Sequence, residues 1–342
     1  MKGEGSILMG RARCDPLTDH ELHAFLSGCL ANGRSSAVIE SVERKVRKRR
    51  ADWRGARLFE RVTVRMAAGE TLKLFLKYRG GHPDPDASMI SMEREARVYR
   101  DLLQDAPLGA PKFFGAHTIE PGGPTLLLLE YLEGRKLKKV QEREAWLAVA
   151  KWLARMHRHF SERQDQLQAC AFLPRHDADF YWKWACRAAA SSSGISPQVS
   201  SSMERLLSGY DKVAGPLGNA PATLLHGEFY CTNVIVSGDP QRLRVCAFDW
   251  ETAAIGCGVL DLAYLFRQPW GVSEPSLIEA YLDGWREAGV LPWSLPQLQA
   301  QILRVRTHEL MCRIWSGIRY RQAPVRKIEK YTKRAGEYLE SL

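Results

Sequence analysis

Two short runs near the middle of the C-terminal half constrain this chain most: His226-Gly227-Glu228-Phe229-Tyr230-Cys231-Thr232-Asn233 and Phe248-Asp249-Trp250-Glu251. Between them lie two apolar segments, 234–236 and 243–248, separated by the turn residues Ser237-Gly238-Asp239-Pro240. Apolar segments on either side of a Gly/Asp/Pro turn are typical of a β-hairpin. The sequence therefore predicts a hairpin that brings the ends of the two runs together.

Three side chains at the ends of this hairpin have complementary chemistry. Glu228 offers a carboxylate, Asn233 an amide and Asp249 a second carboxylate. Phosphoryl transfer requires an acid that orients or deprotonates the attacking hydroxyl, and an amide and a carboxylate that hold Mg²⁺ on the phosphates. The order of acid, four residues, Asn, hairpin and Asp is that of kinases. We therefore expect Glu228 to be the catalytic acid or base, and Asn233 and Asp249 to bind the metal.

With Asp261-Leu262-Ala263 downstream, these motifs resemble the aminoglycoside phosphotransferase and choline kinase family, which are small-molecule kinases with a protein-kinase-like fold. The resemblance extends from about residue 35 to about residue 290. It implies that ATP and Mg²⁺ are the cofactors, and that the γ-phosphoryl group passes to a hydroxyl of a small molecule. It also implies that Asp261 is a structural acid tying the catalytic loop to a helix.

The chain departs from the family at Glu228, where an aspartate is usual. The extra methylene moves the carboxylate outward by roughly 1.5 Å. An active small-molecule kinase is the favoured interpretation, because Asn233 and Asp249 are both present. The alternatives are a nucleotide-binding pseudokinase with weak activity and, because of the basic clusters of the chain, a nucleic-acid-associated protein.

The pattern along the chain predicts an α+β, two-lobed protein-kinase-like fold. Leu72, Leu74 and Leu76 alternate with other side chains, which indicates a strand. Further strand patterns and a helical pattern over 88–104 predict an N-terminal β-sheet lobe with one main helix. Helical spacing dominates after residue 135, which predicts a mostly helical C-terminal lobe. The predicted domains are an N-terminal helical extension, a small nucleotide-binding lobe and a helical catalytic and substrate lobe, with boundaries 1–33, 34–132 and 133–342.

The nucleotide side of a kinase needs a lysine for the α/β-phosphates and a glutamate that orients this lysine. Lys77 ends the predicted strand and Glu95 lies in the following helix. Lys73 shares the strand face with Lys77 and is the alternative lysine, and Glu93 is the alternative glutamate. The family resemblance further implies that Glu130-Tyr131-Leu132 is the hinge, whose backbone binds adenine.

Composition supports a water-exposed globular protein. The 342 residues are 45% hydrophobic and 26% charged, which is ordinary for a globular chain. No apolar run has the length of a membrane span, and the N-terminus does not resemble a signal peptide. Eight scattered cysteines without a CxxC pair favour reduced thiols, so we expect a cytoplasmic protein.

The net charge of +10 favours anionic partners. One basic cluster runs from Arg44 to Arg50, and residues 300–342 carry ten Lys and Arg against four Glu. Cluster 44–50 could contact nucleotide phosphates or nucleic acid, or be a solvated hairpin, which is the favoured interpretation; a nucleic-acid partner is not expected. The basic C-terminal stretch predicts an acceptor that is neutral or anionic.

Two further patterns have open interpretations. Glu251 follows Asp249 by two residues and could contact metal or substrate. Phe180-Tyr181-Trp182-Lys183-Trp184 could form an aromatic cage for a quaternary amine, but aromatic residues at helical spacing are more often part of a core. His226 follows Leu224-Leu225 and is expected to support its loop from behind.

Overall fold

The structure is a computed structural model. It describes residues 17–31, 38–52, 55–80, 90–118, 125–239, 243–267, 271–287, 289 and 291–342, with only the backbone described at 48–52 and 55. The chain divides into two compact units. The first comprises Met1–Gly134 and Cys246–Thr252, and the second comprises Arg135–Val245 and Ala253–Leu342. The stretch 80–86 is rich in Gly, Pro and Asp, which predicts a loop. It lies almost entirely outside the described residues.

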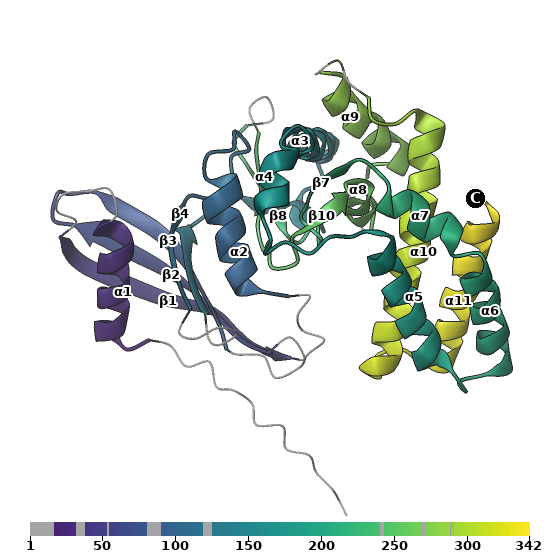
Figure 1. Cartoon of the computed structure of the whole chain (residues 1–342). Coiled ribbons are helices and arrows are strands. Elements are labelled where there is room, and N and C mark those ends of the chain that lie inside the picture. Colours follow the sequence, from purple (N-terminus) through teal and green to yellow (C-terminus); the bar gives the residue numbers. More distant parts are fainter. Residues whose placement is uncertain are drawn as a thin grey trace, which may run out of the picture. The chain divides into compact units, whose positions relative to one another are not determined.

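The first unit is built on a five-stranded antiparallel sheet in the order β1-β2-β3-β5-β4 (Figure 1). Its strands are β1 (Ile39–Asp52), β2 (Gly55–Met66), β3 (Thr71–Arg79), β4 (Phe113–Thr118) and β5 (Thr125–Glu130). The predicted alternation in β3 is confirmed, because Leu74 and Leu76 are fully buried while Leu72 is partly buried against the same core. The basic run from Arg44 is part of β1 and pairs with β2 in a long hairpin.

Helices flank this sheet. Helix α1 (Asp19–Ala31) is preceded by Thr18, which forms a capping box with Glu21: the Glu21 carboxylate accepts the Thr18 N–H at 2.8 Å, and the Thr18 hydroxyl accepts the Glu21 N–H at 3.3 Å. Leu22, Leu26 and Leu30 bury the apolar face of α1 in the sheet core. Helix α2 (Met92–Val98) begins at the N-cap Ser91, whose hydroxyl accepts the N–H of Arg94, and continues as a π-helical turn, η2 (Tyr99–Leu103). The helix expected over 88–104 is therefore shorter and changes hydrogen-bond register.

The second unit is mostly helical (Figure 1). Its helices are η3 (Leu137–Lys139), α3 (Arg143–Ser161), α4 (Gln164–Ala169), α5 (Ala178–Ser192), α6 (Pro197–Ser208), α7 (Asp211–Gly218), α8 (Val259–Leu265), α9 (Glu274–Arg286), α10 (Leu295–Arg319) and α11 (Val325–Glu340). The unit's strands are short: β6 (Arg135–Lys136), β7 (Ala222–Leu225), β8 (Val234–Ser237), β9 (Arg244–Ala247) and β10 (Ala254–Cys257). The boundary between the two units falls within β9.

The short strands form two small sheets that frame the predicted catalytic loop. Strand β7 pairs with β10, and β8 lies between β6 and β9, as the predicted hairpin requires. The sheet unit and the helical unit confirm the α+β class. Among the described helices, none is both long enough and apolar enough to cross a membrane.

Close packing of α3 against α9 depends on a glycine. A Cβ built on Gly284 would lie 2.7 Å from the Cβ of Ala154 and 2.8 Å from the carbonyl oxygen of Lys151. Distances this short require a backbone shift, because a carbonyl oxygen cannot rotate away. Gly336 in α11 is also inside a helix, but a Cβ there would meet no atom within 4 Å.

We predict that these two glycines respond in opposite directions to the same substitution. Gly284→Ala should lower stability by about 1–3 kcal/mol through overpacking, which outweighs the better helix propensity of alanine. Gly336→Ala should raise stability by up to about 1 kcal/mol. Urea unfolding midpoints of both variants test this, and equal midpoints for the two would contradict the packing assignment.

Candidate functional site

A loop in the helical unit carries Glu228 and Asn233, and it is fixed through its backbone. The buried carboxylate of Asp261 accepts the N–H of His226 at 2.7 Å and the N–H of Gly227 at 2.9 Å. Gly227 has a φ of +81°, a left-handed conformation that glycine adopts at little cost. Asp261 therefore holds the start of the loop, consistent with the structural part that the family resemblance gives it.

Asp261 is itself oriented by a buried histidine. His157 on α3 lies with Nε2 3.3 Å from Asp261, and its Nδ1 is 2.9 Å from the hydroxyl of Tyr281 on α9. A Cβ on Gly258 would lie 2.7 Å from the His157 ring, so the chain passes closely over it. His157 was not singled out from the sequence; a polar residue on the apolar face of the predicted helix was the only available signal.

The interior of the loop is packed and hydrogen-bonded as well. Phe229 is fully buried and stacks on Trp152 with ring centroids 5.8 Å apart. The carbonyl of Glu228 accepts the N–H of Tyr230 at 2.7 Å and the side-chain amide of Asn233 at 3.0 Å. His226 is buried behind the loop, and its Nδ1 lies 3.3 Å from the Glu228 N–H. The loop conformation is therefore set by groups other than the Glu228 carboxylate.

The amide of Asn233 is oriented in a way that suits a metal ligand. Its nitrogen donates to the Glu228 carbonyl, and its oxygen accepts the Thr232 hydroxyl at 3.3 Å and has a second lone pair for a cation. Groups that orient a ligand through its second atom are usual around metal sites, and Mg²⁺ prefers oxygen ligands. Asn233 thus fits its predicted role.

Lys77 lies in a buried ion cluster of the sheet unit. Its ammonium is 2.6 Å from Glu95 and forms a short ion pair with Asp249. Burial by itself lowers the pKa of Lys77, but the carboxylates of Asp249, Glu95 and Glu251 outweigh it, so the pKa lies above its ordinary value and the lysine is charged. Burial also raises the pKa of the Glu95 carboxyl to about 7, against the opposing effect of Lys77.

The alternatives considered for these roles lie elsewhere. Lys73 pairs with Glu133 at the surface, and Glu93 is exposed on α2. In the segment predicted as the hinge, the N–H of Glu130 donates to the Lys112 carbonyl at 2.8 Å and that of Tyr131 donates to the Lys73 carbonyl at 2.9 Å. Of the three residues of this segment, only Leu132 has an N–H without a backbone acceptor in the described part of the chain.

Asp249 has a strained backbone. Its φ is +73°, and among the described non-glycine residues only Arg321 shares this property. Left-handed conformations are tolerated best by Asn and Asp apart from glycine, and such strain often marks functional positions. The side chain of Asp249 is 27% exposed, whereas the Lys77 side chain is 3% exposed. Asp249 is thus the more accessible member of the pair.

Glu251 is surrounded by arginines that the sequence did not indicate. Its carboxylate is 3.1 Å from Arg79, 3.4 Å from Lys77 and 3.7 Å from Arg57, and its carbonyl accepts Arg94 at 3.3 Å. The N–H of Ser91 also donates to this carbonyl at 2.9 Å. Arg79 follows Lys77 by two residues and so shares its strand face, which was the only signal in the sequence. These arginines and Glu251 are buried.

The three carboxylates of the cluster form a candidate metal group. One oxygen each from Glu95, Asp249 and Glu251 lies within 4.8 Å of the others. Glu251 is completely buried among its cationic partners, and burial lowers the pKa of both Arg79 and Arg94. Asp249 is therefore the carboxylate best suited to bind a metal, and Glu251 is better suited to fix the segment that carries Asp249.

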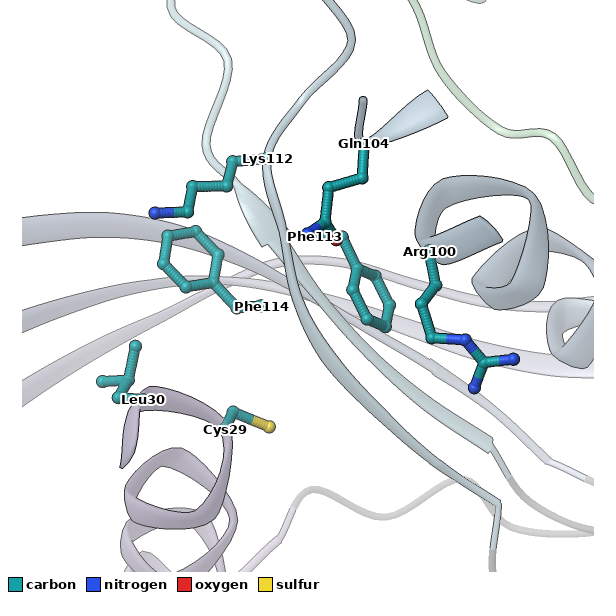
Figure 2. Close-up of a pocket in the computed structure, with 7 residues that line it drawn as sticks. All are labelled: Cys29, Leu30, Arg100, Gln104, Lys112, Phe113 and Phe114. Carbon is teal, nitrogen blue, oxygen red and sulfur yellow. The ribbon is translucent and has the colours of Figure 1, made fainter. Parts of the chain in front are cut away.

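A separate hollow in the sheet unit contains none of these residues. It has a volume of about 320 Å³ and lies between α1, η2 and β4. Figure 2 shows Cys29 and Leu30 of α1 facing the strand that carries Phe114. Lys112 lies over the Phe114 ring at 5.1 Å, and Arg100 is paired with its neighbour Asp101.

The aromatic run over 180–184 is largely part of the core, which is the interpretation that its helical spacing favoured. Tyr181 is fully buried and Trp184 is nearly so, while Phe180 stacks on His176 with centroids 3.7 Å apart. Trp182 donates to Asp211 at 3.2 Å. The aromatic residues of α5 therefore serve packing, as their helical spacing favoured.

Comparisons with known proteins agree with this architecture. A family model described as a phosphotransferase enzyme family matches residues 43–297. No curated protein matches the sequence at a significant level. Solved structures match over nearly the whole chain at low identity. A protein from Ralstonia eutropha, named as a candidate aminoglycoside phosphotransferase, has a TM-score of 0.63 and 15% identity, with 95% of this chain and 99% of the other covered.

Two further solved structures have different acceptors in their names. A choline kinase from Cryptosporidium parvum has a TM-score of 0.54 and 14% identity, with 94% of each chain covered. A spectinomycin phosphotransferase in complex with ADP and spectinomycin has a TM-score of 0.57 and 13% identity, with 96% of this chain and 99% of the other covered. At such identities the likeness shows the fold alone.

We predict that Glu251→Gln destabilises the protein severely. The amide keeps the shape of the side chain but removes the buried carboxylate charge that faces Arg57 and Arg79, and removing one partner of a buried pair costs about 3–5 kcal/mol. Glu93→Gln on the exposed face of α2 is the matched control and should change stability by less than about 0.5 kcal/mol. Urea unfolding measures both, and a Glu251→Gln protein as stable as the control would contradict the assigned anchor.

Proposed function

The chain belongs to the phosphotransferase enzyme family, and from this premise we propose that it transfers the γ-phosphoryl group of ATP to a hydroxyl of a small molecule that is neutral or anionic. The observation that carries the proposal is the buried Lys77, held between Glu95 and Asp249. A lysine kept charged and oriented by a helix glutamate is what binding of the α/β-phosphates requires.

Each predicted residue has a part in this proposal. Lys77 holds phosphates, Glu95 orients it, and the hinge backbone over 130–132 binds adenine. Asn233 and Asp249 hold Mg²⁺, which when bound neutralises charge on the phosphates. Glu228 orients or deprotonates the acceptor hydroxyl. Solved structures of this fold are named with ADP, as in the spectinomycin phosphotransferase, or with GDP, as in an aminoglycoside 2'-phosphotransferase, and this supports a purine nucleotide as the cofactor.

The defining experiment is a screen for ATP-dependent phosphorylation across amino alcohols, sugars, nucleosides and aminoglycosides. Release of ADP above the acceptor-free background identifies the acceptor, and ³¹P NMR of the product identifies the new phosphate ester. ATP binding without turnover of any acceptor would favour the pseudokinase alternative.

The metal assignment predicts that Asp249→Asn abolishes the Mg²⁺-dependent part of ATP binding. Asparagine tolerates the left-handed backbone of this position but lacks the carboxylate charge, so ATP affinity in Mg²⁺ should fall by at least about tenfold. Calorimetric titrations in Mg²⁺ and in EDTA separate the two contributions. Asp101→Asn at the surface is the matched control. A folded Asp249→Asn protein with unchanged Mg²⁺ dependence would refute this role.

The catalytic assignment predicts that Glu228→Gln lowers turnover by at least about a hundredfold and leaves ATP affinity within about twofold. Glu204→Gln on the exposed face of α6 is the control for a neutralised glutamate. Steady-state kinetics and ATP titrations measure both quantities. If the wild type is inactive with every acceptor and Glu228→Asp restores transfer, the chain is a pseudokinase and the proposed activity is wrong.

A further inference from the structure

Arg267 lies close to the loop that carries Glu228. It lies two residues beyond the end of α8, and its guanidinium packs against a pair of neighbouring tyrosine rings, 4.7 Å from the centroid of Tyr230 and 4.8 Å from that of Tyr264. Its Nη1 donates to the Tyr230 hydroxyl at 2.7 Å. Tyr230 is two residues beyond Glu228 and donates its N–H to the Glu228 carbonyl. A single tyrosine therefore connects the guanidinium with the proposed catalytic loop.

Two arginines share one carboxylate at this position. Glu309 on α10 forms an ion pair with Arg267, and the same carboxylate oxygen is 2.7 Å from Arg313. These three groups together carry one net positive charge. The side chain of Glu309 is 11% exposed, while those of Arg267 and Arg313 are 28% and 39% exposed. The cationic groups are the accessible part of this cluster.

The cluster is also preorganised. Contacts with two aromatic faces, a hydroxyl and a carboxylate hold the Arg267 guanidinium in one position, so binding an anion requires little reordering of the side chain. Its buried Nε has no hydrogen-bond partner among the described residues. A brace for Tyr230 would need only one arginine. The second, Arg313, pairs with the same carboxylate of Glu309. No hydrogen bond or ring contact joins Arg313 to Tyr230 in the described structure.

We propose that Arg267 and Arg313 bind an acidic group of the acceptor, a carboxylate or a phosphate, while the acceptor hydroxyl lies at Glu228. The acceptor class is then a small hydroxy acid or a phosphorylated alcohol. This inference rests on the proposed phosphotransferase function and narrows its acceptor from neutral or anionic to anionic. A polycationic acceptor would place like charges against the two arginines.

The test compares acceptors that share a carbon skeleton and differ in the charge of one substituent. Glycerol, glycerate, glycerol 3-phosphate and 3-aminopropane-1,2-diol form one series, and glucose, glucuronate, glucose 6-phosphate and glucosamine form another. Initial rates with saturating Mg-ATP give kcat/KM for each member. The wild type should use the acidic members at least about tenfold better than the neutral member of the same series. The carboxylate and phosphate members distinguish the two acidic groups.

Variants of Arg267 and Arg313 test whether these two residues cause the preference for acidic acceptors. Arg267→Gln and Arg313→Gln should raise the KM for the preferred acid at least about fivefold and bring the ratio of acidic to neutral kcat/KM towards one. The KM for ATP reports separately on the nucleotide site. Arg326→Gln, on an exposed position of α11, is the matched control. Arg313 is the more exposed arginine, so its variant gives an independent result if Arg267→Gln does not fold.

Two outcomes would overturn this inference alone. One is a wild type that prefers neutral or amino acceptors, in these series or in the wider screen, which refutes the acidic acceptor and leaves phosphotransfer intact. The other is an unchanged acid preference in both arginine variants, which removes the cluster from acceptor binding. Absence of ATP-dependent turnover with every acceptor of both series and of the wider screen refutes phosphotransfer itself, together with this inference.

Discussion

The buried carboxylate of Glu251 is the constraint on which the nucleotide side of the protein depends. Strands β2 and β3 each contribute a cation to it, Arg57 and Arg79, and Arg94 of helix α2 donates to the backbone carbonyl of the same residue. Burying a charge without partners is costly. Glu251 is therefore stable in its buried position only when β2, β3 and α2 are folded around the segment after β9. The backbone of Asp249, two residues away, is then held in its left-handed conformation by its neighbours and not by its own preference. Strain of about 1–3 kcal/mol can persist only where the surroundings overdetermine it.

Asp261 has the same relation to the helical unit. Its two carboxylate oxygens accept the N–H groups of His226 and Gly227, and the imidazole of His157 lies next to one of these oxygens. Both carboxylates serve backbone geometry, and both are more deeply buried than the acids proposed to act on ligands. This separation has a physical reason. An acid that binds metal or substrate must remain accessible, whereas the hydrogen bonds of an acid that fixes a loop are stronger in the low dielectric of the interior.

The sequence was sufficient for the fold class and the hairpin, because both depend on short-range patterns. The strand period around Leu74, the turn after Ser237 and the capping box at Thr18 are each encoded within a few residues. The arginines around Glu251 depend on the register of β2 against β3, where Arg57 is opposite Arg79. The cluster at Arg267 depends on where α10 places Glu309. The number of cations in 300–342 does not show which of them have partners: Arg306 is paired with Glu274, and Arg304 donates to the Lys212 carbonyl. Long-range pairing has no signature within a local sequence window.

The fixed loop also bears on the unusual length of Glu228. Its carbonyl is held by Tyr230 and Asn233, and the next residue, Phe229, is stacked in the core. The backbone therefore cannot retract to compensate for a longer side chain, so the added methylene must be taken up by side-chain torsions or by the position of the acceptor. An acceptor held at a distance by its acidic group would have its hydroxyl set by the arginines and not by contact with the loop. In this arrangement the longer acid at position 228 and the cation at position 267 are two parts of one fit to the acceptor.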